Sequence, residues 1–168
     1  MLTENQIKYI NSIPENKITQ IKPFDPRAKQ TGNELVQVIK QKMPELEVLF
    51  MGATELGIAG QNDIDLNVLS SPEEYEKYLP LLKELFGEPI KSSPNLIKWE
   101  FVRNGFDVEL YLTDKNSSLL REQIKTFELL QGNPELLKEY EAIKLASDGL
   151  FFREYMKRKY EFFNKLPR

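Results

Sequence analysis

The sequence contains no cysteine and no histidine, and these two absences restrict the chemistry of the chain. Without cysteine there are no disulfides and no thiolate metal ligands. Without histidine the chain lacks the commonest general base and the usual zinc ligand. Any catalysis must therefore use carboxylates, lysines, tyrosines, hydroxyls or backbone groups. A metal ion would be one that prefers oxygen ligands, such as Mg²⁺ or Mn²⁺.

Long apolar runs are absent as well. No window of the sequence approaches the roughly 18 apolar residues that a membrane span requires. The start of the chain, from Met1 to Gln6, lacks the basic and then apolar layout of a secretory signal. We therefore expect a cytoplasmic protein that has no membrane partner.

The length of 168 residues suits one domain that can bury a sizeable core. Hydrophobic residues make up 40% of the chain and charged residues 29%, which are ordinary values for a globular protein. We expect a single domain over residues 1–168, with a core at about residues 18–113 and C-terminal helices at about residues 116–166. The sequence carries no signal of an oligomeric state.

The net charge of −3 argues against general nucleic-acid binding by the whole surface. The charge is uneven, because residues 150–168 contain six Lys or Arg, Arg168 among them, against two Glu. This basic C-terminal segment could hold a phosphate opposite an acidic site, or it could be a solvated helix face. Both interpretations stay open.

Hydrophobic periodicity and turn signals predict a mixture of helices and strands. Helices are expected at about residues 3–12, 26–43 and 72–86 and from 117 to the end, with breaks at 132–134 and 147–149. Strands are expected at residues 18–23, 47–51, 63–69, 97–102 and 106–112. Asn104-Gly105, between the last two strands, is a strong hairpin signal. This order indicates one layered α/β (α+β) domain with a mixed sheet, one crossover helix and a helical C-terminal region.

Acidic side chains recur on one face of two of these strands. In the strand that begins at Asp63, alternation places Asp63 and Asp65 on one face and apolar side chains on the other. The later strand repeats this arrangement with Asp107 and Glu109. If the two strands are neighbours, up to four carboxylates meet, and they repel one another unless a cation neutralises them or protons are retained. The alternative is that these acids lie on the solvated face of a half-buried sheet.

The order of these motifs resembles a known superfamily. A Gly52-Ala53 turn followed by Asp63-Ile64-Asp65 and a later acidic strand is similar to the pattern of the polymerase-β-type nucleotidyltransferases. Within that superfamily the chain most resembles the GrpB family, over roughly residues 18–163. The motifs that carry this likeness are Pro23-Phe24-Asp25-Pro26, Phe50 to Thr54, Gly60 to Asp65, Asn133-Pro134 with Glu139, Tyr140 and Lys144, and finally Tyr155, Lys159 and Phe163.

Several positions depart from the family pattern. Ala53 replaces a serine whose hydroxyl would help to hold a phosphate, and Phe127 stands where relatives often carry an arginine. Glu109 stands where many relatives place a histidine, and the loop from Gly52 to Asp65 is one residue shorter. The first two changes argue against nucleotide binding. Glu109 argues for it, because it completes the carboxylate triad that metal-dependent members of the superfamily use.

The resemblance implies a nucleotidyltransferase-like mixed β-sheet flanked by helices. It further implies a metal-dependent nucleotidyltransferase that transfers a nucleotidyl or phosphoryl group from a nucleoside triphosphate (NTP) to an unknown acceptor, with Mg²⁺ or Mn²⁺ as cofactor. The implied catalytic residues and metal ligands are Asp63, Asp65 and Glu109, with Asp107 as the alternative third carboxylate. The implied nucleotide- and phosphate-binding residues are Gly52, Ala53, Thr54, Lys144, Tyr155 and Lys159.

Two other functions stay open. The chain could be a catalytically idle relative that binds a nucleotide or a partner protein through the same groove. It could also bind nucleic acid through its basic C-terminal segment, in which case binding would depend steeply on salt and not on the acidic strands. Trp99 shares its strand face with Phe101, so we expect it to pack in the core rather than to stack on a base.

Overall fold

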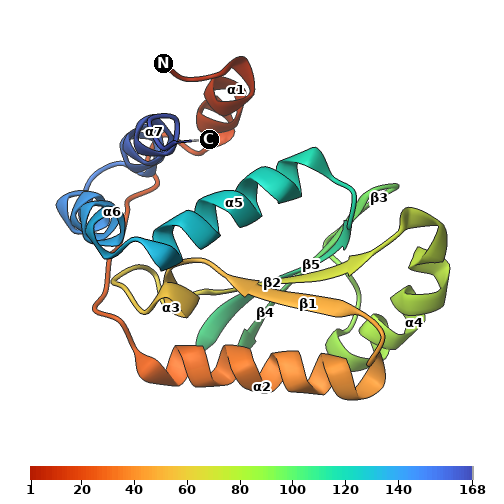
Figure 1. Cartoon of the computed structure of the whole chain (residues 1–168). Coiled ribbons are helices and arrows are strands. Elements are labelled where there is room, and N and C mark those ends of the chain that lie inside the picture. Colours follow the sequence, from red (N-terminus) through yellow and green to blue (C-terminus); the bar gives the residue numbers. More distant parts are fainter. Residues whose placement is uncertain (168) are drawn as a thin grey trace.

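The chain folds into a five-stranded mixed sheet with helices on both faces (Figure 1). The computed structural model describes residues 1–167, and Arg168, counted above in the basic segment, lies outside the described residues. The elements, in chain order, are α1 (Glu4–Ser12), α2 (Pro26–Lys42), β1 (Glu47–Met51), α3 (Ala53–Leu56), β2 (Ile64–Ser70), the 3₁₀ turn η1 (Pro72–Glu74), α4 (Tyr75–Phe86), β3 (Lys91–Ser93), β4 (Leu96–Arg103), β5 (Phe106–Asp114), α5 (Ser118–Gly132), α6 (Pro134–Ala146) and α7 (Phe152–Phe163). Among the described residues, no helix combines the length and the hydrophobicity that crossing a bilayer requires.

The strands lie in the order β1-β2-β5-β4-β3. Only β2 and β5 are parallel, and the other three pairs are antiparallel. A parallel pair needs a long connection, and here that connection contains α4, β3 and β4. The mixed sheet flanked by helices is the fold class that the sequence predicts.

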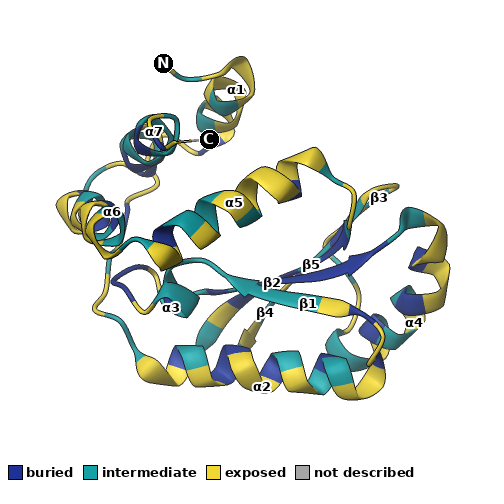
Figure 2. Ribbon diagram, in the orientation of Figure 1, coloured by how far each residue is buried: buried dark blue, intermediate teal, exposed yellow. Residues whose placement is uncertain are grey.

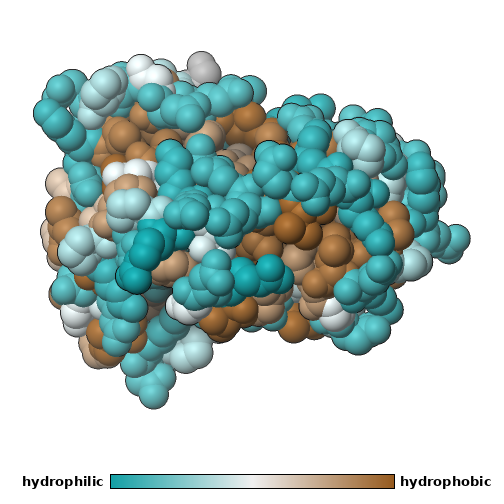
Figure 3. Space-filling model, turned by 90° about the horizontal axis from the view of Figure 1, so that it is seen from below, coloured by the Kyte–Doolittle hydropathy of each residue, from teal (hydrophilic) through white to brown (hydrophobic). Residues whose placement is uncertain are grey.

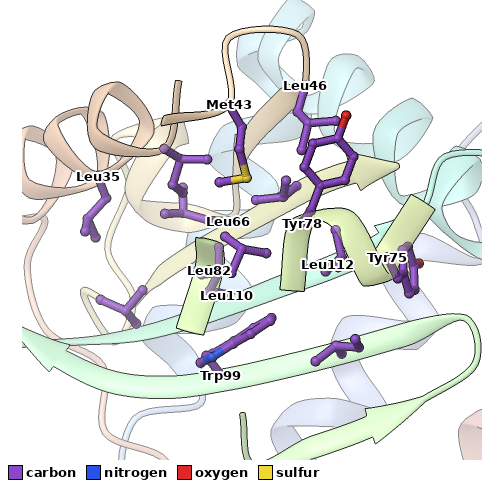
Figure 4. Close-up of a cluster of buried hydrophobic side chains, with 14 of the residues drawn as sticks. Leu35, Met43, Leu46, Leu66, Tyr75, Tyr78, Leu82, Trp99, Leu110 and Leu112 are labelled. Carbon is purple, nitrogen blue, oxygen red and sulfur yellow. The ribbon is translucent and has the colours of Figure 1, made fainter. Parts of the chain in front are cut away.

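One face of the sheet packs on α2 and α4 and forms the main core. Figure 2 shows the burial of the central strands, and Figure 4 shows how side chains from both helices meet those of the sheet. Leu66 and Leu110 from the two central strands are fully buried, and so is Leu35 from α2. Trp99 packs here too, with its indole N–H donating to the carbonyl of Gly87 at 2.8 Å. The core role expected for Trp99 is confirmed.

The opposite face of the sheet meets the C-terminal helices. Figure 1 shows α2 and α5 on opposite sides of the sheet, with α6 and α7 beyond α3. A second cluster of buried side chains joins the loop after α3 to these helices through Ile58, Leu130, Tyr140 and Phe162. Tyr140 and Phe162 stack with their ring centroids 5.7 Å apart. The loop between α3 and β2, which leads to Asp63, therefore packs against the C-terminal helices.

Local sequence signals set several of the element boundaries. Thr3 forms the expected capping box with Gln6, and Asp25 caps α2 through the N–H of Arg27. Asn104 and Gly105 both have positive φ angles, 53° and 82°, as a two-residue type I′ hairpin turn requires.

The strand expected at residues 18–23 was wrong. That segment makes only two isolated bridges, from Ile18 to Phe151 and from Lys22 to Gly60. It crosses between separate parts of the molecule, so no single neighbour lines up with it for several residues. The short elements α3 and β3 were not expected, because elements of four and three residues are too short to show a periodicity.

The hairpin offers a direct test of the core. Replacing Leu110 by Ala should lower the free energy of unfolding by about 2–5 kcal/mol, because it removes a fully buried side chain between two helices and leaves a cavity. Val102→Thr on the paired strand is the matched control, since Val102 is 64% exposed and the change should stay within about 0.5 kcal/mol. Urea unfolding of both variants measures the difference. Equal losses would contradict this assignment of the two faces.

Candidate functional site

The acidic strands are neighbours in the sheet, as the sequence analysis required. Asp65 on β2 is the register partner of Glu109 on β5, so the two side chains start from adjacent positions on the same face. Asp63 lies one residue before β2, and Asp107 is exposed two residues before Glu109. Of the two alternatives for the third carboxylate, Glu109 is therefore the one that the register sets beside Asp65.

Burial makes the two aspartates reluctant to carry charge. It raises the pKa of Asp65 well above its usual value, and the nearby carboxylates of Asp63 and Glu109 raise that pKa further. Burial also raises the pKa of Asp63, although the ammonium of Lys144 opposes this shift. A cation placed between these carboxylates would remove much of the repulsion.

Glu109 already has cationic and hydroxyl partners on its other side. The ammonium of Lys98 lies 3.1 Å from its Oε1 and also 2.7 Å from Oε1 of Glu100. The hydroxyl of Tyr111 donates to Oε2 of Glu109 at 3.2 Å. Sequence reasoning missed Lys98. The signal was present, because the Asn104-Gly105 turn fixes the hairpin register and sets Lys98 opposite Tyr111.

A glycine turn lies directly against the acids. Gly52 has a φ of 89° and a ψ of −177°, a region that only glycine occupies readily. A Cβ atom there would lie 2.5 Å from Oδ2 of Asp65, so the backbone approaches this carboxylate as closely as glycine allows. The hydroxyl of Thr54 donates to the backbone carbonyl of Asp63 and ties the turn to the start of β2.

A glycine comparison tests this close approach. Gly52→Ala should destabilise the protein more than Gly57→Ala, because both residues have positive φ but only the Gly52 substitution brings a Cβ against Asp65. We expect about 1–2 kcal/mol for Gly57→Ala, the usual penalty of a left-handed alanine. The loss for Gly52→Ala should exceed it by at least about 1 kcal/mol. Chemical denaturation measures both, and a smaller loss for Gly52→Ala would contradict the packing described.

Two lysines from the C-terminal helices complete the site. Lys144 on α6 is buried and donates to the hydroxyl of Tyr155 at 2.8 Å. Burial lowers the pKa of Lys144 to about 7, and the neighbouring charge of Lys159 contributes to the shift. For Lys159 on α7 burial acts in the same direction, but Tyr155 and Asp65 outweigh it and raise the pKa of this lysine. Positive groups of the helices thus face negative groups of the sheet.

The loop from Gly57 to Gly60, between α3 and β2, is held by hydrogen bonds from two sides. The backbones of Lys22 and Gly60 exchange two hydrogen bonds, of 2.7 and 3.0 Å. On α6, Oε1 of Glu141 accepts the N–H of Ala59 at 2.8 Å. A Cβ at Gly60 would lie 3.7 Å from the ammonium of Lys144. Sequence reasoning missed Glu141, because only the packing of α6 shows that it reaches this loop.

The low pKa of Lys144 predicts a pH dependence of stability. Below about pH 7 this lysine is charged in both the folded and the unfolded chain, and the penalty of burying the charge is full. At higher pH the folded chain releases the proton while the unfolded chain keeps it, so the free energy of unfolding rises. Between pH 7 and 9 the stability of the parent protein relative to Lys144→Met should rise by about 2 kcal/mol.

Urea unfolding at the two pH values measures this change. Lys138→Met, at an exposed position of the same helix, is the control and should follow the parent protein at both values. A constant difference between the parent protein and Lys144→Met would show that the lysine is not held in a low-dielectric environment.

The site offers two carboxylates to a divalent cation, but it does not offer a group of three. Within residues 1–167, no three acidic side chains are grouped so that they could hold a metal ion. However, Mg²⁺ is usually bound by only one or two carboxylates together with phosphate oxygens and water. Asp63 and Asp65 fit that role, because they are half-buried and their charges are disfavoured by desolvation and by neighbouring carboxylates. Glu109 fits it less well, because Lys98 is its partner.

Two surface clefts lie away from the acids. One of about 600 Å³ runs along α2 and the segment before it, between Phe24 and Gln37. Figure 3 views this side of the molecule, where hydrophobic patches interrupt a mainly hydrophilic surface. The other, of about 250 Å³, lies between α1 and α7 and includes Ile7 and Arg153. Neither cleft contains Asp63, Asp65 or Glu109, so neither belongs to this site.

Solved structures of other proteins show which known fold this chain shares. A structure of Cid1, described by its RNA terminal uridylyl transferase activity, matches with a TM-score of 0.52 and 19% identity, over 83% of this chain and 43% of that chain. A structure of the Cid1 poly(U) polymerase with Mg 3′-dATP bound matches with a TM-score of 0.52 and 21% identity, over the same shares. The chain therefore has a nucleotidyltransferase fold and spans less than half the length of these relatives.

The sequence identifies the family. The pattern of the family described as GrpB protein matches residues 18–168, and the chain belongs to this family. No curated protein matches the sequence. The resemblance stated from the motifs is confirmed.

Proposed function

We propose that this GrpB-family chain is a metal-dependent nucleotidyltransferase, which transfers a nucleotidyl or phosphoryl group from an NTP to an acceptor. The observation that carries the proposal is the register of β2 and β5, which sets Asp65 beside Glu109. Beside this pair lies the Gly52 turn, and opposite it lie Lys144 and Lys159. Few structural roles require a buried lysine and half-buried acids to lie together at a glycine turn.

The two aspartates and the two lysines bind complementary parts of the substrate. Asp63 and Asp65 would hold Mg²⁺ or Mn²⁺, which would neutralise charge on the phosphates. Lys144 and Lys159 contact the phosphates from the helical side. A bound phosphate would raise the pKa of Lys144 from about 7 and so keep its ammonium charged. Tyr155 orients Lys144 through their hydrogen bond.

The glycine turn and Glu109 have separate tasks. The N–H groups of the first turn of a helix have no partner within the helix, and those of Ala53 and Thr54 supply donors to a phosphate beside Gly52. The Thr54 hydroxyl is occupied by the Asp63 carbonyl, so its part is to hold the turn. Glu109 accepts the proton of the acceptor hydroxyl. Its side chain remains partly exposed, so that an acceptor can reach it.

A catalytically idle relative that binds a nucleotide or a partner protein is the second candidate function. It is favoured by Ala53, which lacks a hydroxyl, and by the engagement of Glu109 with Lys98. Such a protein would bind an NTP without converting it, so binding and turnover must be measured separately.

Thermal unfolding with each of the four ribonucleoside triphosphates, with and without Mg²⁺, tests the site. At a ligand concentration of about 100 times Kd, we expect a rise in Tm of about 5–10 °C that requires both ligands. Asp63→Asn and Asp65→Asn should abolish the rise. In the absence of ligands these two variants should be at least as stable as the parent protein, because they remove a repelling charge.

Asp107→Asn is the matched control, since Asp107 is an exposed acid on the same strand as Glu109 and should leave the shift intact. Incubation with labelled NTPs and a cell extract then separates the two functions, because only the enzyme produces a labelled acceptor. No shift with any nucleotide would contradict both the enzyme and an idle nucleotide-binding relative.

A further inference from the structure

The row of charges across the sheet extends beyond the proposed catalytic acids. Reading across neighbouring strands, Asp65 on β2 is followed by Glu109 on β5 and by Glu100 on β4, since each is the register partner of the next. Lys98 lies on the same face of β4 and contacts both glutamates, at 3.1 and 2.7 Å. One ammonium thus serves two of the three carboxylates in this row.

The side chain of Lys98 is held in this position by contacts and is largely shielded from solvent. Its side chain is 19% exposed, and its ammonium lies 5.3 Å from the ring centroid of Tyr111. Tyr111 donates its hydroxyl to the other oxygen of Glu109 at 3.2 Å, so both oxygens of this carboxylate have a donor from the chain. A half-buried ammonium with two carboxylate partners and a ring beneath it is hard to displace.

The carboxylates of the row therefore differ in whether they have a cationic partner. Among the described residues, the ion pairs of this row go to Glu109 and Glu100, and none goes to Asp63 or Asp65. Glu109 has a cation of the chain in contact with it. Two-metal sites place their ions about 3.5–4 Å apart, so a second ion beside one held by Asp65 would need Glu109, its register partner, as a ligand. An ammonium 3.1 Å from Glu109 competes for that carboxylate.

We infer that Lys98 takes the place of a second divalent cation, so that the site binds one metal ion, at Asp63 and Asp65, rather than two. This inference rests on the proposed function and refines it. Lys98 supplies the positive charge beside Glu109, and Glu109 is then a base and counterion rather than a metal ligand. Removing the ammonium should free Glu109 to bind a second ion beside Asp65.

Counting bound Mn²⁺ tests this inference without reference to turnover. The probes are Mn²⁺ and inorganic tripolyphosphate, which carries the phosphates that all NTPs share. Titration calorimetry gives the number of ions per chain, and electron paramagnetic resonance detects the spin coupling of two Mn²⁺ ions about 4 Å apart. We expect one ion and no coupling for the parent protein, and two coupled ions for Lys98→Met.

Two further variants separate charge from structure. Lys98→Arg keeps the cation and should bind one ion. Lys91→Met removes an exposed lysine of β3, the register partner of Lys98, and should also bind one ion. Two ions in the parent protein, or one ion in Lys98→Met, would overturn the inference and leave the proposed function standing. Absence of Mn²⁺ from every variant would overturn the proposed function and this inference together.

Discussion

The parallel pairing of β2 with β5 is the constraint on which the rest of the site depends. The register that sets Leu66 beside Leu110 in the core also sets Asp65 beside Glu109 on the opposite face. Because side chains alternate along a strand, a slip of one residue would move the acids into the core and the apolar side chains out of it. The buried half of each strand therefore determines where the charged half lies.

The C-terminal helices affect the charges of these acids in two opposing ways. Helices α6 and α7 pack on the loop that leads into β2, and desolvation at this end of the strand raises the pKa of Asp65 and makes its charge unfavourable. The same helices bring Lys144 and Lys159 to the acids, but each lysine loses water as well. Acids and lysines thus offset one another only in part. A polyphosphate with its cation carries both signs of charge, so the cation would pair with the acids and the phosphates with the lysines.

Much of this arrangement follows from local sequence signals, and the rest does not. Alternation predicted which side of each strand is acidic, and the Asn104-Gly105 turn fixed the hairpin register, so Lys98 could have been found from it. Tertiary packing decided the remainder. Lysine is ordinarily exposed, and only the stacking of α6 on α7 shows that Lys144 is buried. The residues before Pro23 fail as a strand because their partners are distant loops, which no local pattern records.

The departures from the family pattern become easier to understand when Glu109 and Lys98 are considered as a pair. A histidine, which the resemblance to the family leads us to expect at this position, can accept a proton without needing a cation. A glutamate next to the already repelling Asp63 and Asp65 adds a third negative charge, and the energy of that charge must be lowered by a neighbour. Lys98 is that neighbour, at 3.1 Å on the side away from Asp65. Glutamate is compatible with this site because the adjacent strand carries the lysine, and the two positions are coupled through a single ion pair.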